Sequence, residues 1–262
     1  MSKLFTLQIT ASKCNYQLRV NDIITIIETE GFNVDYEIPI NHLILFGINK
    51  VDITLLPLRN EKTVSKLARL KVIVFEREHQ KERETRINLA QYIAPDFTPK
   101  ETTPPLTLIH AIAFENTDTF FKNDTWHSIL QPLSKDEVYN QVVSFYKQFY
   151  TFMAAKNLRS IMALLQQRMI QYSTATYQDQ NEFIAQNNEF YDSMFANENI
   201  IAWPLQKQKL ILLDNFGSQL FTLKNEIQES PLIFYNTKEK ESHYVDIFLG
   251  KIKNEKDFKI IL

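Results

Sequence analysis

Glycine and cysteine are scarce in this sequence, and their scarcity argues against several kinds of site. The chain has 262 residues, of which 4 are glycine and 1 is cysteine. Backbone that approaches a phosphate group closely usually needs glycine, and the chain contains neither a Walker loop nor the glycine fingerprint of dinucleotide-binding domains. It also lacks the Gly-x-Ser-x-Gly motif. We therefore expect no nucleotide chemistry of the common kinds.

The single cysteine, Cys14, excludes an intramolecular disulfide and a zinc site built from cysteines of this chain. Its only basic neighbour is Lys13, so we predict a structural thiol in a reducing compartment and not a nucleophile. None of the 5 histidines stands at metal-ligand spacing from another. His110 shares the strand phase of Ile112 and Phe114, which predicts a position in the core. We expect no metal and no cofactor.

No long block of one charge sign and no long apolar run is present. The 29 basic and 31 acidic residues leave a net charge of -2, which gives no electrostatic footprint for nucleic acid or an anionic membrane. A membrane-spanning helix needs about 18 consecutive apolar residues, and no stretch reaches that length. Phe5, Leu7 and Ile9 alternate with polar residues, as in a strand and unlike a signal peptide. These features predict a cytoplasmic protein, or a periplasmic one if a leader has been removed.

Residues 4 to 115 repeat with a period close to two. Ile53 and Leu55 alternate with polar neighbours, for example, as do Val72 and Val74. Several short strands separated by turn residues are typical of a β-sandwich. We therefore predict an antiparallel β-sandwich domain over residues 1–118. The stretch 119–133, which is rich in Asn, Asp, Thr and Ser, is predicted to be a linker.

The turns of this half suit tight connections between strands. Asn21-Asp22 stands between two strand-like runs, and both residue types tolerate left-handed backbone angles. The segments Val20-Asn21-Asp22, Pro39-Ile40-Asn41 and Gly47-Ile48-Asn49 together resemble a phrase in jelly-roll domains of sugar-processing enzymes. Asp22 stands where that phrase usually has glycine. Because turn chemistry explains these residues, we interpret the segment as scaffold and not as a site.

After residue 133 the period becomes helical and then returns to two. Ser134 and Glu137 have the spacing of a helix capping box. The helix that follows carries an apolar stripe made of Val138, Val142, Phe145, Phe149 and Phe152. Two more helices are predicted before residue 200, and strands follow Trp203. Helices followed by an antiparallel meander predict an α+β domain over residues 134–262.

This second half resembles the nuclear transport factor 2-like superfamily. Two segments carry the resemblance: the long aromatic helix that breaks into a second helix, Phe145–Leu165, and the closing segment His243–Ile261. The resemblance implies a cone-like domain of three helices and a curved antiparallel sheet around a pocket. Some family members use the pocket for acid–base chemistry and others only for binding. The Asp and Tyr of the family's isomerases have no match in this sequence.

Three side chains are candidates for lining such a pocket. Tyr146 and Tyr150 lie one helical turn apart, and His243 shares a strand phase with Ile247. Phenols with a pKa of ~10 are poor bases at neutral pH. Asp246 and His243 are an odd number of residues apart, so on one regular strand their side chains would point to opposite faces. We therefore name no catalytic residue and predict Tyr146, Tyr150 and His243 as ligand-binding residues.

Two tryptophans are candidate anchors for a protein partner, Trp126 in the linker and Trp203 before a proline. Packing at the joint between the domains is the alternative role for both. In the absence of a catalytic constellation, we favour a non-enzymatic interaction protein that binds another protein. Within that class we favour a bacterial toxin-immunity or secretion-accessory protein whose partner is a cognate toxin. A homo-oligomer is compatible with the same features.

Two other classes of function remain open. One is a small-molecule-binding protein or an enzyme that uses the cone pocket, and the other is a carbohydrate-binding module that uses the sandwich. A buried pair of acid–base groups in a pocket would favour an enzyme, because catalysis needs such groups within reach of the substrate. Exposed aromatic residues on a shallow sheet face would favour a sugar. A filled cone together with an exposed apolar patch would favour a protein partner.

Overall fold

The computed structural model describes residues 2–79, 86–119, 125–205 and 208–262, except for the side chains of residues 125 and 126. The chain forms two compact units, Met1–Asp124 with Ala175–Tyr177, and Thr125–Thr174 with Gln178–Leu262. It first passes from one unit to the other inside the stretch 119–133, which the sequence marks as a linker. Strands make up 38% of the structure and helices 25%, so the predicted mixed class with a majority of β structure is confirmed.

None of the helices within the described ranges has both the length and the apolar composition that crossing a membrane requires.

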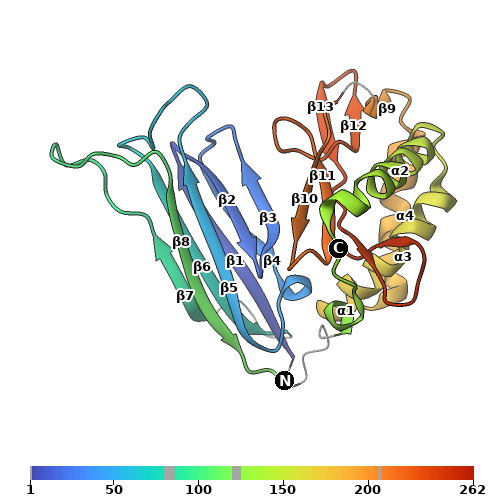
Figure 1. Cartoon of the computed structure of the whole chain (residues 1–262), viewed down its shortest axis with the longest axis horizontal. Helices are drawn as coiled ribbons and strands as arrows, with labels where there is room; N and C mark the ends of the chain where they lie inside the picture. Colours follow the sequence, from blue (N-terminus) through green and yellow to red (C-terminus); the bar gives the residue numbers. More distant parts are fainter. Residues whose placement is uncertain (1, 80–85, 120–124, 206–207) are drawn as a thin grey trace. The chain divides into compact units, whose positions relative to one another are not determined.

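The first unit is built from strands, as the period of two predicts. Within the described residues they are β1 (Lys3–Ser12), β2 (Asn15–Val20), β3 (Ile23–Glu28), β4 (Val34–Pro39), β5 (Gly47–Leu56), β6 (Arg69–Glu78), β7 (Ile87–Ile93) and β8 (Leu108–Asn116), with a short 3-10 helix at Asn41–Leu43. They form two antiparallel four-stranded sheets, in the orders β4-β1-β6-β7 and β3-β2-β5-β8 (Figure 1). The prediction that this region is nearly all β is confirmed for the residues that the structure describes.

The tight turn predicted at Asn21-Asp22 is present and joins β2 to β3. Both residues have positive φ, 49° and 65°, as a two-residue hairpin turn requires. The Asn21 side chain also donates to the Leu43 carbonyl and accepts from the Lys50 backbone amide, each at 3.0 Å. These bonds tie the turn to the 3-10 helix and to β5, which is a structural role.

Aromatic side chains from the two sheets of the first unit touch one another. The rings of Phe5 on β1 and Phe114 on β8 lie 6.2 Å apart, and both residues are buried. The hydroxyls of Tyr16 on β2 and Tyr36 on β4 lie 3.2 Å apart. These two contacts bring residues of the two sheets together.

The prediction of a core position for His110 is wrong. His110 is exposed, and its ring stacks on Tyr92 with a centroid distance of 4.6 Å. β8 is the edge strand of its sheet, and only its second half is buried, where Ile112 and Phe114 face the core. Strand phase indicates the face of a residue but not how far along the strand that face stays covered.

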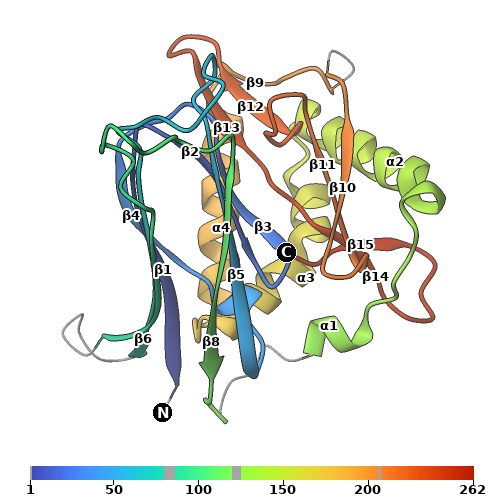
Figure 2. The ribbon, with the colours of Figure 1, turned by 60° about the vertical axis from the view of Figure 1, so that its left-hand side comes forward.

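The second unit combines helices with short strands. Within the described residues its elements are α1 (Thr125–Ile129), α2 (Lys135–Ala154), α3 (Leu158–Ala175), α4 (Gln180–Ala196), β9 (Ile200–Ala202), β10 (Ile211–Asn215), β11 (Leu220–Lys224), β12 (Ile233–Asn236), β13 (Glu241–Tyr244), β14 (Leu249–Lys251) and β15 (Phe258–Ile260). The strands form two antiparallel sheets, β10-β11-β14-β15 and β13-β12-β9. α2 runs beside β10 and β11, and a hydrogen bond between the hydroxyls of Tyr146 and Thr222 links α2 to β11 (Figure 2).

The capping box predicted at the start of α2 is confirmed. The Ser134 hydroxyl accepts from the Glu137 amide at 3.4 Å, and the Glu137 carboxylate accepts from the Ser134 amide at 3.3 Å. Each side chain thereby satisfies a backbone donor that the first turn leaves without a partner.

The apolar stripe of α2 differs in part from the prediction. The buried residues are Val138, Val142, Tyr146, Phe149 and Met153. Phe145 and Phe152, which were expected in the core, are only partly buried. The residues of the predicted stripe are spaced by about 3.5 on average, whereas a straight helix has about 3.6 residues per turn. Residues at that spacing therefore rotate gradually away from the buried face along the helix.

Candidate functional site

Four side chains form an exposed apolar patch on one face of the sheet β13-β12-β9. They are Ile201, Trp203, Tyr235 and Tyr244, which we call the Trp203 face. Ile201 of β9 is directly opposite Tyr235 of β12, and Tyr244 of β13 is opposite Ile233, two residues from Tyr235. Side chains opposite each other on antiparallel strands point to the same face, as do residues two apart on one strand. Trp203 follows β9 and contacts the Tyr235 ring.

The side chains of the Trp203 face are accessible to a partner. Ile201 is 44% exposed, Trp203 is 38% exposed and Tyr244 is 43% exposed. The opposite side of the sheet is covered at β12, because Phe234 is buried and its ring lies 6.3 Å from that of Tyr191 on α4. All four residues of the edge strand β13 are exposed.

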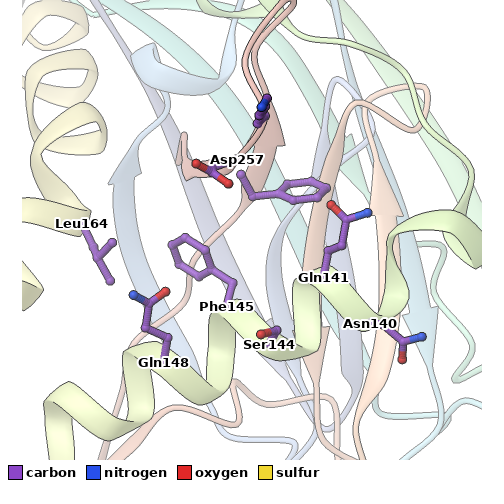
Figure 3. A pocket seen from close by; sticks show the side chains of 9 residues that line it. Asn140, Gln141, Ser144, Phe145, Gln148, Leu164 and Asp257 are labelled. Atoms are coloured by element: carbon purple, nitrogen blue, oxygen red, sulfur yellow. The ribbon is translucent and has the colours of Figure 1, made fainter.

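A groove runs along α2 and reaches α3 and the loop before β15. It has a volume of about 640 Å³, and its floor is formed by Phe145, Leu164 and Phe258. An adjoining hollow of about 460 Å³ shares these three residues. Figure 3 shows Gln141 and Gln148 of α2 beside Phe145, with Asp257 across from them.

The polar lining of this groove is dominated by neutral side chains. They are Asn140, Gln141, Ser144, Gln148, Gln166 and Gln167. Amide groups both donate and accept hydrogen bonds, so such a lining suits a neutral polar ligand. The ionisable lining residues are Asp257, Lys256 and Lys259, and none of the lining residues is a histidine or cysteine. Lys259 is paired with Glu255 at 2.7 Å, and the amide side chains outnumber the charged ones, so the groove suits the binding of a polar ligand.

A smaller cavity of about 330 Å³ lies between α3 and α4. The guanidinium of Arg168 and the rings of Tyr172, Phe183 and Tyr191 belong to its wall. Tyr172 and Phe183 stack with a centroid distance of 5.2 Å and an interplanar angle of 17°. This cavity thus combines one cation with a flat aromatic wall.

The predicted ligand-binding residues do not come together at any of these three sites. Tyr146 is fully buried; its hydroxyl donates to the Ile247 carbonyl at 3.0 Å and accepts from the Leu223 amide at 3.1 Å. Burial raises the pKa of Tyr146 well above its ordinary value. Tyr150 is partly buried against the core of the second unit. His243 is exposed on β13.

The predicted continuous strand phase from His243 to Leu249 is interrupted. β13 ends at Tyr244 and β14 begins at Leu249, so the residues between them are not part of a regular strand. Ile247 is buried in that connection and His243 is exposed on β13, so the two are not residues of one strand. The Asp246 carboxylate pairs with the buried Lys224 at 2.6 Å.

The structure describes only one of the two tryptophan side chains that were predicted to bind a partner. The Trp126 side chain lies outside the described residues, and its backbone belongs to α1. Trp203 is the centre of the exposed patch defined above. The other members of that patch, Ile201, Tyr235 and Tyr244, were not singled out from the sequence. Their common signal is the period of two on three short strands. β12 and β13 form a hairpin over 233–244, but the pairing of β9 with β12 joins residues 32 to 36 positions apart.

Cys14 is a structural thiol, as predicted. It is buried, and its Sγ donates to the Arg69 carbonyl at 3.4 Å. Desolvation by burial raises the pKa of the thiol to about 11, so it stays protonated at neutral pH. In the part of the chain that the structure describes, no group of three or more His, Cys, Asp or Glu residues is arranged to hold a metal ion.

No protein-family model, curated protein or solved structure matches the chain. Function is therefore inferred from the geometry of the exposed patch and the cavities.

Proposed function

We propose that this protein is a non-enzymatic interaction protein that binds another protein through the Trp203 face. The observation that supports this proposal is the gathering of Ile201, Trp203 and Tyr244, each between 38% and 44% exposed, on one sheet face. Tryptophan and tyrosine are the residue types that most often dominate binding energy at protein interfaces. Isolated exposed apolar residues are normal, but a group of aromatic ones on one face indicates a contact surface.

The geometry of the two central rings favours a protein partner over a sugar. Trp203 and Tyr235 lie 5.2 Å apart with an interplanar angle of 68°. A sugar ring stacks flat on an aromatic face, and two rings at such an angle do not offer one continuous flat platform. A protein side chain inserted between them would contact both, since aromatic pairs also pack edge to face.

The finer identity that we propose follows the sequence features. The first unit is a β-sandwich, supported by the aromatic contacts between its two sheets. The second is a cone-like domain of the nuclear transport factor 2-like type, with α2 packed beside its strands. Within the interaction class, we propose a bacterial toxin-immunity or secretion-accessory protein that works in the cytoplasm and binds a cognate toxin. Its near-neutral charge of -2 gives no support to nucleic acid or anionic membranes as partners.

The test is affinity purification from the native cell with three baits, compared by quantitative mass spectrometry. The baits are the wild type, Trp203→Ala and Phe190→Ala. Phe190 is a matched control, because it is an aromatic residue of the second unit with 53% exposure that lies outside the Trp203 face. A specific partner should be retained by wild type and Phe190→Ala and reduced at least about tenfold by Trp203→Ala, as expected for a hot-spot residue.

The partner so identified is then purified and titrated against the same three proteins by calorimetry. A loss of affinity confined to Trp203→Ala, with an unchanged circular dichroism spectrum, supports the proposal. Equal affinity of all three proteins would show that the face is not the interface. Turnover of a small substrate by the wild type would argue for the enzymatic alternative.

The alternative with specific support is the binding of a neutral polar ligand in the α2 groove. It rests on the amide side chains above the apolar floor of Phe145 and Phe258. Ligand-observed NMR with maltose and N,N′-diacetylchitobiose tests it. Contact signals from a sugar that disappear in Gln148→Leu would favour this function, and their absence at high sugar concentration would exclude these ligands.

A further inference from the structure

The cavity between α3 and α4 is independent of the Trp203 face and has its own chemistry. Arg168 points one guanidinium nitrogen, Nη1, at the Asp246 carbonyl, with a donor–acceptor distance of 2.7 Å. A guanidinium has five N–H donors, and this is the one hydrogen bond of Arg168 within the described residues. The remaining donors are therefore available to a ligand in the cavity.

The charge of Arg168 has no acidic partner among the described residues. The nearby Asp246 carboxylate is already paired, because Lys224 Nζ lies 2.6 Å from its Oδ1. Arg168 is only partly buried, and an anion that enters the cavity meets this cation without a competing carboxylate. Burial raises the pKa of the Tyr172 and Tyr191 hydroxyls, and the positive charge of Arg168, which lines the same cavity, opposes that rise.

We propose that this cavity binds a small organic carboxylate with a flat apolar body, such as a monocyclic aromatic acid. Arg168 receives the carboxylate through two parallel N–H groups, the geometry that a guanidinium offers to planar anions. The stacked pair of Tyr172 and Phe183 provides a flat wall for the ring. Met169 of α3 also lines the cavity and offers a flexible apolar side chain to the ligand.

The size and charge of the cavity narrow the class of ligand. Its volume of about 330 Å³ is at the lower end of the range typical for small-molecule sites, which suits one ring and excludes a nucleotide. A single arginine matches a single negative charge. The apolar Leu165, Met169 and Phe183 in the wall disfavour small hydrophilic anions such as citrate, whose polar groups would be buried without partners.

The first experiment compares phenylacetate with phenylacetamide, two probes of the same shape that differ in charge. Both are titrated against the full-length protein by ligand-observed NMR and calorimetry. The acid should bind at least about tenfold more tightly than the amide. The reason is that a hydrogen bond to a charged group contributes more free energy than a hydrogen bond to a neutral group. No binding of the acid, or equal binding of both probes, would overturn the proposal.

The second experiment assigns the site with variants. Arg168→Met should abolish the preference for the acid, and Arg168→Lys should keep part of it, because lysine retains the charge without the fork. Arg159→Met is the matched control, since Arg159 is an exposed arginine on the same helix. Tyr172→Leu leaves the charge of Arg168 in place, so it should lower the affinity for both probes to a similar degree. Unchanged binding of phenylacetate to folded Arg168→Met would refute the site even if the wild type binds the acid.

Discussion

Phe149 is the residue whose truncation should destabilise the second unit most clearly. It is fully buried on α2 and belongs to the core cluster. Phe149→Ala removes most of a buried aromatic side chain and leaves a cavity, so we expect a loss of roughly 3–5 kcal/mol in the free energy of unfolding. Phe145→Ala is the control and should lose less, because Phe145 is partly buried and lines the groove. Urea denaturation measures both, and a loss below about 0.5 kcal/mol for Phe149→Ala would contradict the core assignment.

Cys14 should react with alkylating reagents only when the protein opens. The thiolate is the reactive form, and burial raises the pKa of this thiol to about 11. At about pH 8, we therefore expect modification by iodoacetamide to be slow in the native protein and fast in urea. Mass spectrometry over time gives both rates. Equal rates in the two conditions would show that Cys14 is accessible in the folded state.

Residue roles were predictable where the evidence is local and not where partners are distant in the chain. Sequence reasoning identified Cys14 as structural from its neighbours. It assigned Tyr146 to ligand binding, whereas the Tyr146 hydroxyl bonds to Thr222, Leu223 and Ile247, 76 to 101 residues further along. No local pattern contains such partners. Arg168 was missed for the same reason, since its cavity depends on how α3 packs on α4.

At the scale of elements, the cap of α2 offers a direct test. Ser134→Ala removes the hydroxyl that accepts from the Glu137 amide, so we expect a loss of about 1 kcal/mol in stability. Ser134→Asp keeps an acceptor at the same position and should remain within a few tenths of a kcal/mol of the wild type. Thermal and urea unfolding of the two variants are compared. Equal destabilisation by both would show that the loss is not a loss of capping.

The types of the helices and strands, and the residues at which they begin, could be predicted from the sequence. The residues at which they end and the faces that they bury were less predictable. The hairpin at Asn21-Asp22 and the capping box are set by residues within four positions of one another. Which face of α2 is most deeply buried depends on what packs against it, and Tyr146 replaced Phe145 there. β13 ends at Tyr244 although the alternation continues to Leu249, because the chain leaves one sheet and enters the other.

For the whole molecule, the periodicity of the sequence was sufficient for the class of fold but not for the site. The period of two and the helical stretch indicated the mixed class with a majority of β structure. The Trp203 face requires three strands from separate segments to pair, with Ile201 opposite Tyr235 and Tyr244 opposite Ile233. The pairing of β9 with β12 joins residues 32 to 36 positions apart, and no local pattern in the sequence contains both strands.

Buried tyrosines should make the stability of the whole molecule fall at high pH. Desolvation is the main cause that raises the pKa of seven phenols: Tyr16, Tyr36, Tyr92, Tyr146, Tyr172, Tyr177 and Tyr191. For Tyr177 the value is about 12. In the unfolded chain a phenol loses its proton near ~10. Above that pH the unfolded state binds fewer protons than the folded state, so the free energy of unfolding decreases as pH rises.

The stabilisation by these neutral phenols is complete below the unfolded pKa of ~10 and is lost as the pH rises toward the folded values. We expect the urea midpoint to be steady between about pH 8 and pH 9 and to fall progressively from about pH 10 to pH 12. Phenolate absorbance should increase together with the loss of near-ultraviolet circular dichroism, because phenols held in the core ionise on unfolding. Surface ion pairs contribute little, and repeating the series at high salt removes most of their effect. A constant midpoint up to pH 12, or full phenolate absorbance with an intact dichroism signal, would show that these tyrosines are open to solvent.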